Sequence, residues 1–230
     1  MSSNKQRAAA AAAELITDGM VLGLGTGTTA SYLVQILGER VRQGLRIQGV
    51  PTSEATRQLA VAEGVPLTTL EEQTVLDLCL DGADEVDPEL NLIKGGGGAL
   101  LREKIVASAA RQRIIMVDVS KCVGCLGAFP LAVEVIPFGW EVTRRQLEQF
   151  GGVPTLRQRE GKPFVTDQGH YIIDCALSQI EDAPRLNHQL NQLPGVVENG
   201  LFVDMTDRLI IGSPDGITEK HKNSYFNTTW

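Results

Sequence analysis

The sequence predicts an α/β protein in which a parallel sheet, covered by helices on both faces, is accompanied by a smaller α+β domain. Three observations lead to this prediction. The first half of the chain alternates short strand segments with helical segments, the strand segments are almost continuously apolar, and the order of elements changes after about Pro130. Strand–helix alternation is typical of parallel sheets, and continuously apolar strands are expected where both faces of a sheet are buried.

The first domain is predicted from four strands and the helices between them. An alanine run at 8–13 precedes the first strand and indicates an amphipathic helix capped near Ser3 or Asn4. Strands are expected at 20–25, 46–50, 75–80 and 114–119, and helices at 28–39, around 57–62 and at 99–110. A further strand at 209–212 is expected to return to this sheet.

The segment after Pro130 has a different pattern. Its expected elements are a strand at 133–138, a helix at 142–150, strands at 155–159 and 163–166, a turn at 167–169, a strand at 171–176, a helix at 183–193 and a strand at 196–203. Strand–helix–strands–helix–strand is the ferredoxin-like order. We therefore expect a small domain at 130–204 and a main domain formed by 1–129 and 205–230.

The end of the chain carries no such pattern. Residues 219–230 are polar and show no periodicity, which predicts a loosely held tail. Three aromatic residues in it remain without an assigned role: Tyr225, Phe226 and Trp230.

Composition narrows the classes of function. Of 230 residues, 43% are hydrophobic and 21% charged, which suffices for a packed core. A net charge of -7 without basic clusters argues against nucleic acid and anionic membrane surfaces as partners. No apolar stretch approaches the roughly 20 residues of a membrane span. The alanine run lacks the leucine-rich core of a signal peptide, and Glu14 follows it directly, so a cytoplasmic protein is expected.

The cysteines do not predict a metal site. Cys122 and Cys125 form a lone C-x-x-C, whereas a zinc site would need a second pair or nearby histidines. The three histidines, His170, His188 and His221, are scattered along the chain. We expect reduced, structural cysteines, as is usual in the cytosol.

The unusual polar and glycine-rich clusters of the first domain all fall at one edge of the predicted sheet. Ligands of open α/β sheets bind outside the carboxyl ends of the strands. The loops at that edge are 23–29, 52–54, 81–87, 94–98 and 118–121. Their convergence is stronger evidence for a ligand site than any single loop.

The first of these loops, G-L-G-T-G-T-T at 23–29, suits a phosphate group. Glycines let the backbone approach a ligand, and N–H groups at the start of a helix donate to phosphate oxygens. The loop has no P-loop lysine, and Thr28 stands where the dinucleotide fingerprint has its third glycine. The second strand ends at 49–51 without the acid that binds a ribose. The alternative to a phosphate site is a turn that only packs a helix on a strand.

Acidic residues follow the third strand. Asp81 and Asp84 are separated by Gly82 and Ala83 in D-G-A-D-E-V-D. This loop lacks the alternation and the closing glutamate of an EF-hand. The alternative to a catalytic role is a solvated acidic loop in which Asp81 caps a helix.

The run K-G-G-G-G at 94–98 opens the helix that carries Glu103. Four glycines are costly in backbone entropy, so a sharp bend or close contact with a ligand is indicated. Lys94 supplies a positive charge there. The alternative for Lys94 is a surface lysine. Taken alone, Glu103 would sooner be read as a partner of Arg102 or Lys104 on an exposed face.

These groups together suit the movement of a carbonyl between two carbons of a phosphosugar. A carboxylate within hydrogen-bond reach can remove the proton next to the carbonyl, which is worth about 10²–10⁴-fold in rate. A positive charge at the developing enediolate oxygen is worth about 2.7–4 kcal/mol. Glu103 is the candidate base, Lys94 the candidate electrophile, and Asp81 or Asp84 a candidate for moving hydroxyl protons and opening the ring. This chemistry needs no redox cofactor.

The motifs resemble those of the A-type ribose-5-phosphate isomerases. The matching segments are G-L-G-T-G-T-T (23–29), T-S-E-A-T (52–56), D-G-A-D-E-V-D (81–87), K-G-G-G-G-A-L-x-R-E-K (94–104), V-D-V-S-K (117–121), F-P-L-A-V-E-V-I-P (129–137) and G-S-P-D-G (212–216). They extend over nearly the whole chain from about residue 5 to residue 216, and their combination is specific although each alone is not.

The resemblance implies a Rossmann-like domain with a smaller ferredoxin-like lid. It implies interconversion of D-ribose 5-phosphate and D-ribulose 5-phosphate through an enediol, in the non-oxidative branch of the pentose phosphate pathway, without a metal or other cofactor. Because members usually form dimers or tetramers, we expect a homodimer or a homotetramer.

The resemblance also assigns residues. The general base carries over onto Glu103, and the other catalytic groups onto Asp81, Asp84 and Lys94. The substrate contacts carry over onto Thr28, Thr29, Ala30, Ser31, Gly82, Ala83, Gly95, Gly96, Gly97 and Lys121.

Three features depart from the family pattern. Thr29 stands where the family often has serine, which keeps a hydroxyl. Arg7 lies near the place of a first-helix lysine that can assist with phosphate. The tail after about Thr218 is longer than usual.

Three other functions compete with isomerisation of a ribose phosphate. An aminosugar-phosphate isomerase or a lactonase would need a histidine near the acids, and the motif loops have none. A sugar-phosphate sensor would need an output module, and the chain has no spare basic segment for one. An NAD oxidoreductase is disfavoured by the first loop.

Overall fold

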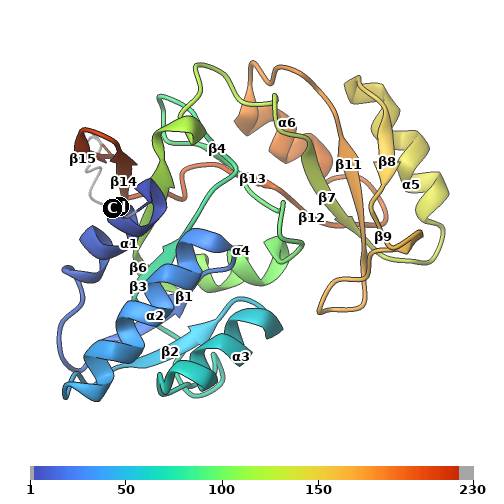
Figure 1. Ribbon diagram of the computed structural model, residues 1–230. Coiled ribbons are helices and arrows are strands. Elements are labelled where there is room, and N and C mark those ends of the chain that lie inside the picture. Colours follow the sequence, from blue (N-terminus) through green and yellow to red (C-terminus); the bar gives the residue numbers. More distant parts are fainter. Residues whose placement is uncertain (1–2, 223–230) are drawn as a thin grey trace, which may run out of the picture.

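The main sheet has six strands in the order β15-β14-β6-β3-β1-β2 (Figure 1). The computed structural model describes residues 3–222. Its strands β14, β6, β3, β1 and β2 run parallel, and β15 pairs antiparallel with β14. The strands are β1 (Val21–Leu24), β2 (Gln48–Pro51), β3 (Leu76–Asp81), β6 (Ala110–Asp118), β14 (Arg208–Ser213) and β15 (Gly216–His221). The parallel sheet is confirmed, and its order reverses between β1 and β3, where such sheets bind ligands.

Helices cover both faces of this sheet. On one face lie α1 (Asn4–Ala13), α2 (Thr28–Arg42) and α3 (Glu54–Glu63), which share a core with Leu78 and Leu80. On the other face lies α4 (Leu100–Ser108), which packs with Cys79. Alternate residues of a strand point to opposite faces. Asp81 therefore ends β3 on the same face as Cys79, toward α4.

The second sheet is antiparallel, with the order β12-β7-β11-β8. Its elements in chain order are β7 (Leu131–Val135), α5 (Trp140–Leu147), β8 (Pro154–Leu156), β11 (Tyr171–Cys175), α6 (Ala183–Leu190) and β12 (Val196–Asn199). This is the predicted ferredoxin-like arrangement, which Figure 1 shows at one end of the molecule. A short hairpin of β9 (Gln158–Arg159) and β10 (Lys162–Pro163) extends from it.

A third, three-stranded sheet joins the two and was not predicted. It has the order β13-β5-β4, with β4 (Glu85–Val86), β5 (Leu92–Ile93) and β13 (Leu201–Phe202). The single strand expected at 196–203 is wrong, because the chain changes sheets at Gly200. A Cβ there would lie 2.3 Å from the carbonyl oxygen of Lys94, so only glycine allows this crossing.

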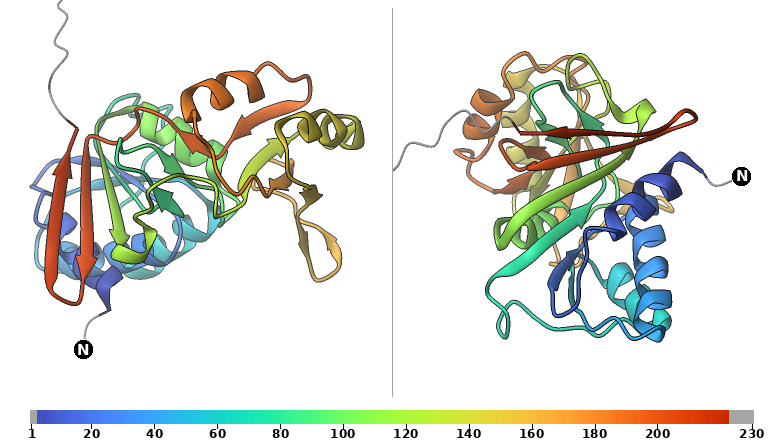
Figure 2. Two further views of the ribbon diagram at one scale, coloured as in Figure 1. Left: turned by 90° about the horizontal axis from the view of Figure 1, so that it is seen from above. Right: turned by 90° about the vertical axis from the view of Figure 1, so that its left-hand side faces the viewer.

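The prediction of a loose tail from residue 219 is wrong for its first residues. Residues 219–221 belong to β15, which forms a hairpin with β14 at the edge of the main sheet (Figure 2). An ion pair between Arg208 and Glu219 adds to the backbone pairing. Polar, alternating residues suit an edge strand exposed on both faces. Tyr225, Phe226 and Trp230 lie outside the described residues.

Helix α1 is held against the main sheet by small side chains. Ser3 and Gln6 form the capping box that starts it, as expected near Ser3. Four alanines of the run are buried against α2 and the sheet: Ala8, Ala9, Ala12 and Ala13. Within residues 3–222, none of the helices has the length and apolar character needed to cross a membrane.

Gly212 of β14 sets the distance between this helix and the sheet, because a Cβ there would lie 2.0 Å from the carbonyl oxygen of Asn4. We expect Gly212→Ala to displace α1 and to lower the free energy of unfolding by about 1–3 kcal/mol, measured by urea denaturation. Gly124→Ala is the control, because a Cβ at Gly124 meets nothing within 4 Å. Equal stability of the two variants would show that α1 is not held in this way.

Candidate active site

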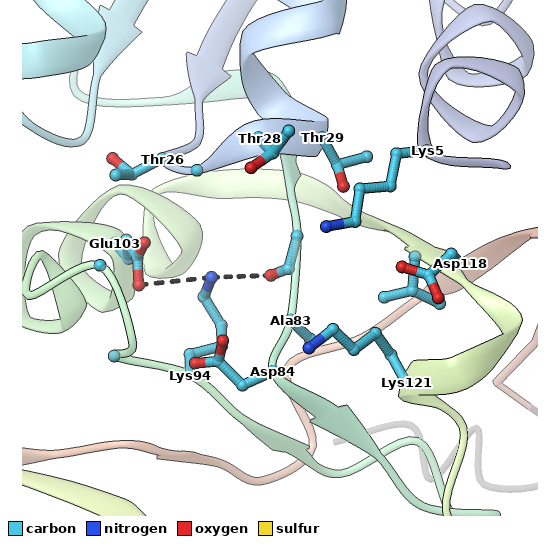
Figure 3. A pocket seen from close by; sticks show the side chains of 15 residues that line it. Lys5, Thr26, Thr28, Thr29, Ala83, Asp84, Lys94, Glu103, Asp118 and Lys121 are labelled. Carbon is cyan, nitrogen blue, oxygen red and sulfur yellow. Dashed lines mark hydrogen bonds and ion pairs between the residues drawn. The ribbon is translucent and has the colours of Figure 1, made fainter. Parts of the chain in front are cut away.

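A pocket of about 280 Å³ opens where the order of the main sheet reverses (Figure 3). It lies at the carboxyl ends of β1, β3 and β6, as the loop clusters predicted. Its lining comes from five parts of the chain and consists of Lys5, Thr26, Gly27, Thr28, Thr29, Gly82, Ala83, Asp84, Lys94, Gly95, Gly97, Glu103, Val117, Asp118 and Lys121.

Asp81 lies beneath the pocket at the end of β3 and is only 3% exposed. Its Oδ1 accepts hydrogen bonds from the N–H groups of Gly82 (2.7 Å) and Thr26 (3.1 Å). A Cβ on Gly25 would lie 2.1 Å from the same oxygen. The glycine of the first loop is therefore needed to let the backbone donate to this carboxylate.

Lys94 directly follows β5 and is 4% exposed. Its Nζ donates to the carbonyl oxygen of Gly82 at 2.7 Å. It also lies 3.1 Å from Oδ2 of Asp81 and 3.3 Å from Oε2 of Glu103. The ring of Phe202 in β13 lies 5.4 Å from the same nitrogen. One buried ammonium thus pairs with two buried carboxylates, and Lys94 is not the surface lysine that it could have been.

Glu103 lies in the first turn of α4 and is 4% exposed. Oε2 of Glu103 and Oδ2 of Asp81 are buried and receive no hydrogen bond, so the ammonium of Lys94 is what compensates them. The alternative of an exposed glutamate paired with Arg102 or Lys104 is wrong. Arg102 binds Gln168, and Lys104 binds Glu198.

Burial governs the protonation of this triad. Burial raises the pKa of Glu103 to about 8, and the positive charge of Lys94 opposes the rise while Asp81 adds to it. Burial also raises the pKa of Asp81, again against the effect of Lys94. Burial alone would lower the pKa of Lys94, but the two carboxylates outweigh it and raise that pKa. Glu103 is therefore a carboxyl group poised to take and release a proton near neutral pH.

Asp84 is half-buried and lines the pocket. Its Oδ2 accepts a hydrogen bond of 2.8 Å from the N–H of Gly96. A Cβ on Gly96 would lie 2.8 Å from the other carboxylate oxygen. The glycine run is thus in direct contact with Asp84, and it bends sharply at Gly95, whose φ is +107°.

The other end of the pocket carries two lysines and the carboxylate of Asp118. Thr28 and Thr29 begin α2, where the free N–H groups of a helix attract anions. Lys121 enters from the 3-10 helix η1 (Val119–Lys121), and Lys5 enters from α1. Figure 3 shows the amines of both lysines reaching into the pocket. This combination suits a phosphate group.

Most of the predicted substrate contacts line the pocket, namely Thr28, Thr29, Gly82, Ala83, Gly95, Gly97 and Lys121. Three do not. Ala30 is buried within α2, Ser31 donates its hydroxyl to the carbonyl of Gly27, and Gly96 is engaged with Asp84.

The sequence analysis missed Lys5 altogether and named Thr26 and Asp118 only as members of the site loops. It pointed instead to Arg7 as the first-helix cation, but Arg7 donates to the carbonyls of Ser213 (2.7 Å) and Pro214 (2.8 Å). Lys5 and Arg7 are two positions apart on a helix and point in different directions. No signal in the sequence distinguishes them, because the packing of α1 against the sheet decides which of the two faces the pocket.

In the C-x-x-C pair, Cys125 contacts backbone carbonyls of its own chain. The thiol of Cys125 donates to the carbonyls of Leu126 and Ile180, and both cysteines of the pair are free. Among residues 3–222, no three histidine, cysteine or acidic side chains gather as a metal site would require.

Comparison with known proteins places this fold and site in one family. The family model described as ribose 5-phosphate isomerase A (phosphoriboisomerase A) matches residues 48–216. A curated relative from Rhodopseudomonas palustris (strain HaA2), named ribose-5-phosphate isomerase A, is 56% identical over 220 residues, covering 93% of this chain and 95% of the relative. The chain belongs to the ribose 5-phosphate isomerase A family.

Solved structures of ribose 5-phosphate isomerases share the whole architecture. The enzyme from Methanocaldococcus jannaschii is 42% identical, with a TM-score of 0.91, over 95% of this chain and 98% of that one. A D-ribose-5-phosphate isomerase in complex with phospho-erythronic acid is 40% identical, with a TM-score of 0.91, over 95% of this chain and 97% of that one. The Rossmann-like and ferredoxin-like arrangement is thus that of the family.

The raised pKa of Glu103 has a consequence for stability. The pKa rises from 4.5 in the unfolded chain to about 8 in the folded protein. Below pH 4.5, protonated Glu103 therefore contributes its full share to the free energy of unfolding. This contribution decreases as the pH rises and is lost once the pH has passed 8. The melting temperatures of the parent and of Glu103→Gln can be measured by calorimetry. We expect the difference, parent minus variant, to decrease from pH 4.5 to pH 8 and to stay constant above pH 8. A difference that stays constant from pH 4.5 to pH 8 would contradict the raised pKa.

Proposed function

We propose that this chain interconverts D-ribose 5-phosphate and D-ribulose 5-phosphate through an enediol, with Glu103 as the base that moves a proton between C1 and C2. The observation that carries the proposal is the polarity of the pocket. A buried carboxyl with a pKa of about 8 lies beside a buried ammonium at one end, and two lysines with the N-terminus of α2 lie at the other.

The geometry supports the following course of reaction. The phosphate binds at Lys5, Lys121 and the start of α2, which directs the carbonyl carbon of the open sugar toward Glu103. Glu103 removes the proton from the carbon next to the carbonyl and returns it to the neighbouring carbon. Lys94 stabilises the negative oxygen of the enediolate, because its charge is already fixed by the triad and needs no reorganisation.

The remaining proton transfers need a second carboxylate, for which Asp81 and Asp84 are the candidates. The aldose becomes a ketose only when a proton also moves from one oxygen to the other, and ring opening needs a proton at the ring oxygen. Asp84 lines the pocket, whereas Asp81 lies behind Lys94. This placement favours Asp84 for direct contact with the sugar and Asp81 for holding Lys94.

The relatives add support for the substrate. The ligand of one relative, phospho-erythronic acid, combines a phosphate with a planar anionic carboxylate. These two groups resemble the phosphate and the enediolate of the proposed intermediate. A pocket of about 280 Å³ is of the size that a pentose phosphate needs.

Four other expectations stay predictions. They are the division into a main domain (1–129 and 205–230) and a lid (130–204), assembly as a homodimer or homotetramer, a cytoplasmic location, and the absence of any cofactor. Light scattering on the purified protein would settle the assembly. Turnover in the presence of EDTA would settle whether a dissociable metal takes part.

The role of Glu103 can be tested by proton NMR in D₂O containing EDTA. With ribose 5-phosphate, we expect the parent to form ribulose 5-phosphate with deuterium on the carbons that exchange protons. Glu103→Gln keeps the shape of the side chain but not the base, so its turnover should fall by about 10²–10⁴-fold. Binding without turnover or deuterium exchange in the parent would refute the isomerase and favour a sensor. Absence of binding would mean another substrate class.

The phosphate end can be tested separately. Lys5→Met and Lys121→Met each remove one charged donor, worth about 1.5–3 kcal/mol. We expect each to raise KM for ribose 5-phosphate about ten- to hundredfold, with a smaller effect on kcat. Lys162→Met in the exposed hairpin strand β10 is the control. An unchanged KM in both pocket variants would place the phosphate elsewhere.

A further inference from the structure

One side chain of the ferredoxin-like unit reaches the glycine run between β5 and α4. Arg157 lies between β8 and β9, and its Nη1 donates to the carbonyl oxygen of Gly95 at 2.7 Å. A second, longer contact of 3.4 Å joins the same nitrogen to the carbonyl oxygen of Gly96. Gly95 directly follows Lys94 in the chain, so this contact falls beside the buried triad.

The contacted carbonyl belongs to the peptide group that serves Asp84. The C=O of Gly95 and the N–H of Gly96 are two ends of one planar amide. Its oxygen accepts from Arg157 at 2.7 Å, and its nitrogen donates to Oδ2 of Asp84 at 2.8 Å. The guanidinium at the oxygen and the carboxylate at the N–H both shift electron density in the amide from nitrogen toward oxygen. The two hydrogen bonds therefore strengthen one another.

Arg157 is itself fixed in place. Its Nε donates to Oδ2 of Asp174 in β11 at 2.9 Å, and its Nη2 binds the other oxygen of the same carboxylate. The guanidinium also lies 6.0 Å from the ring of Phe164. That ring packs against the loop so closely that a Cβ on Gly98 would lie 2.4 Å from it. The side chain of Arg157 is only 16% exposed.

We propose that Arg157 is a positioning residue for the isomerisation, which orients and polarises the Gly95–Gly96 peptide and through it holds Asp84 in its catalytic position. Asp174 in turn orients Arg157. This inference rests on the proposed function, in which Asp84 transfers protons on the sugar. Arg157 itself does not line the pocket, so no direct contact with the sugar is proposed for it.

The chain provides a matched control for this role. Arg159 also lies over Phe164, 5.1 Å from its ring, but it is exposed and makes no hydrogen bond to the glycine run within the described residues. Arg157→Ala and Arg159→Ala each remove a guanidinium from the same ring. Only the first removes the donor to the Gly95 carbonyl.

Kinetics give the first measurement. We expect Arg157→Ala to lower kcat about ten- to hundredfold while KM changes less, and Arg159→Ala to retain the kcat of the parent. Low millimolar guanidinium should restore part of the activity of Arg157→Ala and have no effect on Arg159→Ala. Lysine is not an equivalent replacement, because an ammonium lacks the planar fork that binds Asp174 and Gly95 together. Arg157→Lys should therefore have a kcat closer to that of Arg157→Ala than to that of the parent.

NMR gives a second measurement that does not depend on turnover. In protein labelled with [1-¹³C,¹⁵N]glycine, a carbonyl-selected spectrum shows only amides preceded by another glycine, which are Gly96, Gly97, Gly98 and Gly152. We expect one of these amide protons to shift upfield in Arg157→Ala, and a smaller shift of the same peak in Asp174→Asn. Arg159→Ala should leave it in place.

The outcomes separate the two proposals. An unchanged amide spectrum together with equal kcat values for Arg157→Ala and Arg159→Ala would overturn the role of Arg157 in an active enzyme. An inactive parent would refute the proposed function, and the amide shift would still decide whether Arg157 acts on this peptide. If Arg157→Ala fails to fold, Asp174→Asn and Arg157→Lys carry the same comparison.

Discussion

The structure depends above all on one buried ammonium between two buried carboxylates. Lys94, Asp81 and Glu103 are each 4% exposed or less. Removing three charges from water costs several kcal/mol per ion, and such groups are retained only where geometry compensates them. With all three ionised the group carries one net negative charge, and one added proton makes it neutral. A site that stores a proton in this way suits proton transfer to and from carbon.

Three different parts of the fold bring these side chains together. Asp81 ends a central strand of the main sheet, Lys94 follows β5 of the small three-stranded sheet, and Glu103 lies in the first turn of α4. The small sheet also brings Phe202 against Lys94. The glycines are placed for the same purpose, because Gly25 lets the backbone donate to Asp81 and Gly96 lets it donate to Asp84. The glycine-rich loops thus hold carboxylates as well as admitting a phosphate.

The edge of the sheet at which these residues meet could be predicted from the sequence. Parallel strands bring the loops that follow them to one edge, whatever the details of packing. The sequence was not sufficient for the triad itself. Lys94 alone was compatible with an exposed position, and Glu103 alone favoured one. The sheet that contains β5 and β13 places Phe202 against Lys94. Those strands have two residues each, which is too short for any periodicity. Lys5 was missed because the choice between it and Arg7 depends on the rotation of α1 against β14, which tertiary packing decides.

The same charges explain how an acidic chain can bind a phosphosugar in one orientation. The net charge of -7 repels a phosphate in general, so the pocket must overcome it locally. In the proposed binding mode, Lys5, Lys121 and the start of α2 do so at one end and outweigh Asp118 there. At the other end Asp81, Asp84 and Glu103 outnumber Lys94, so a phosphate placed there would meet excess negative charge. Repulsion of the phosphate at the acidic end and its attraction at the basic end favour the same orientation of the sugar. In the proposed mechanism, the polarity of the pocket therefore directs the carbonyl end of the sugar to Glu103 without requiring a separate contact for each hydroxyl group.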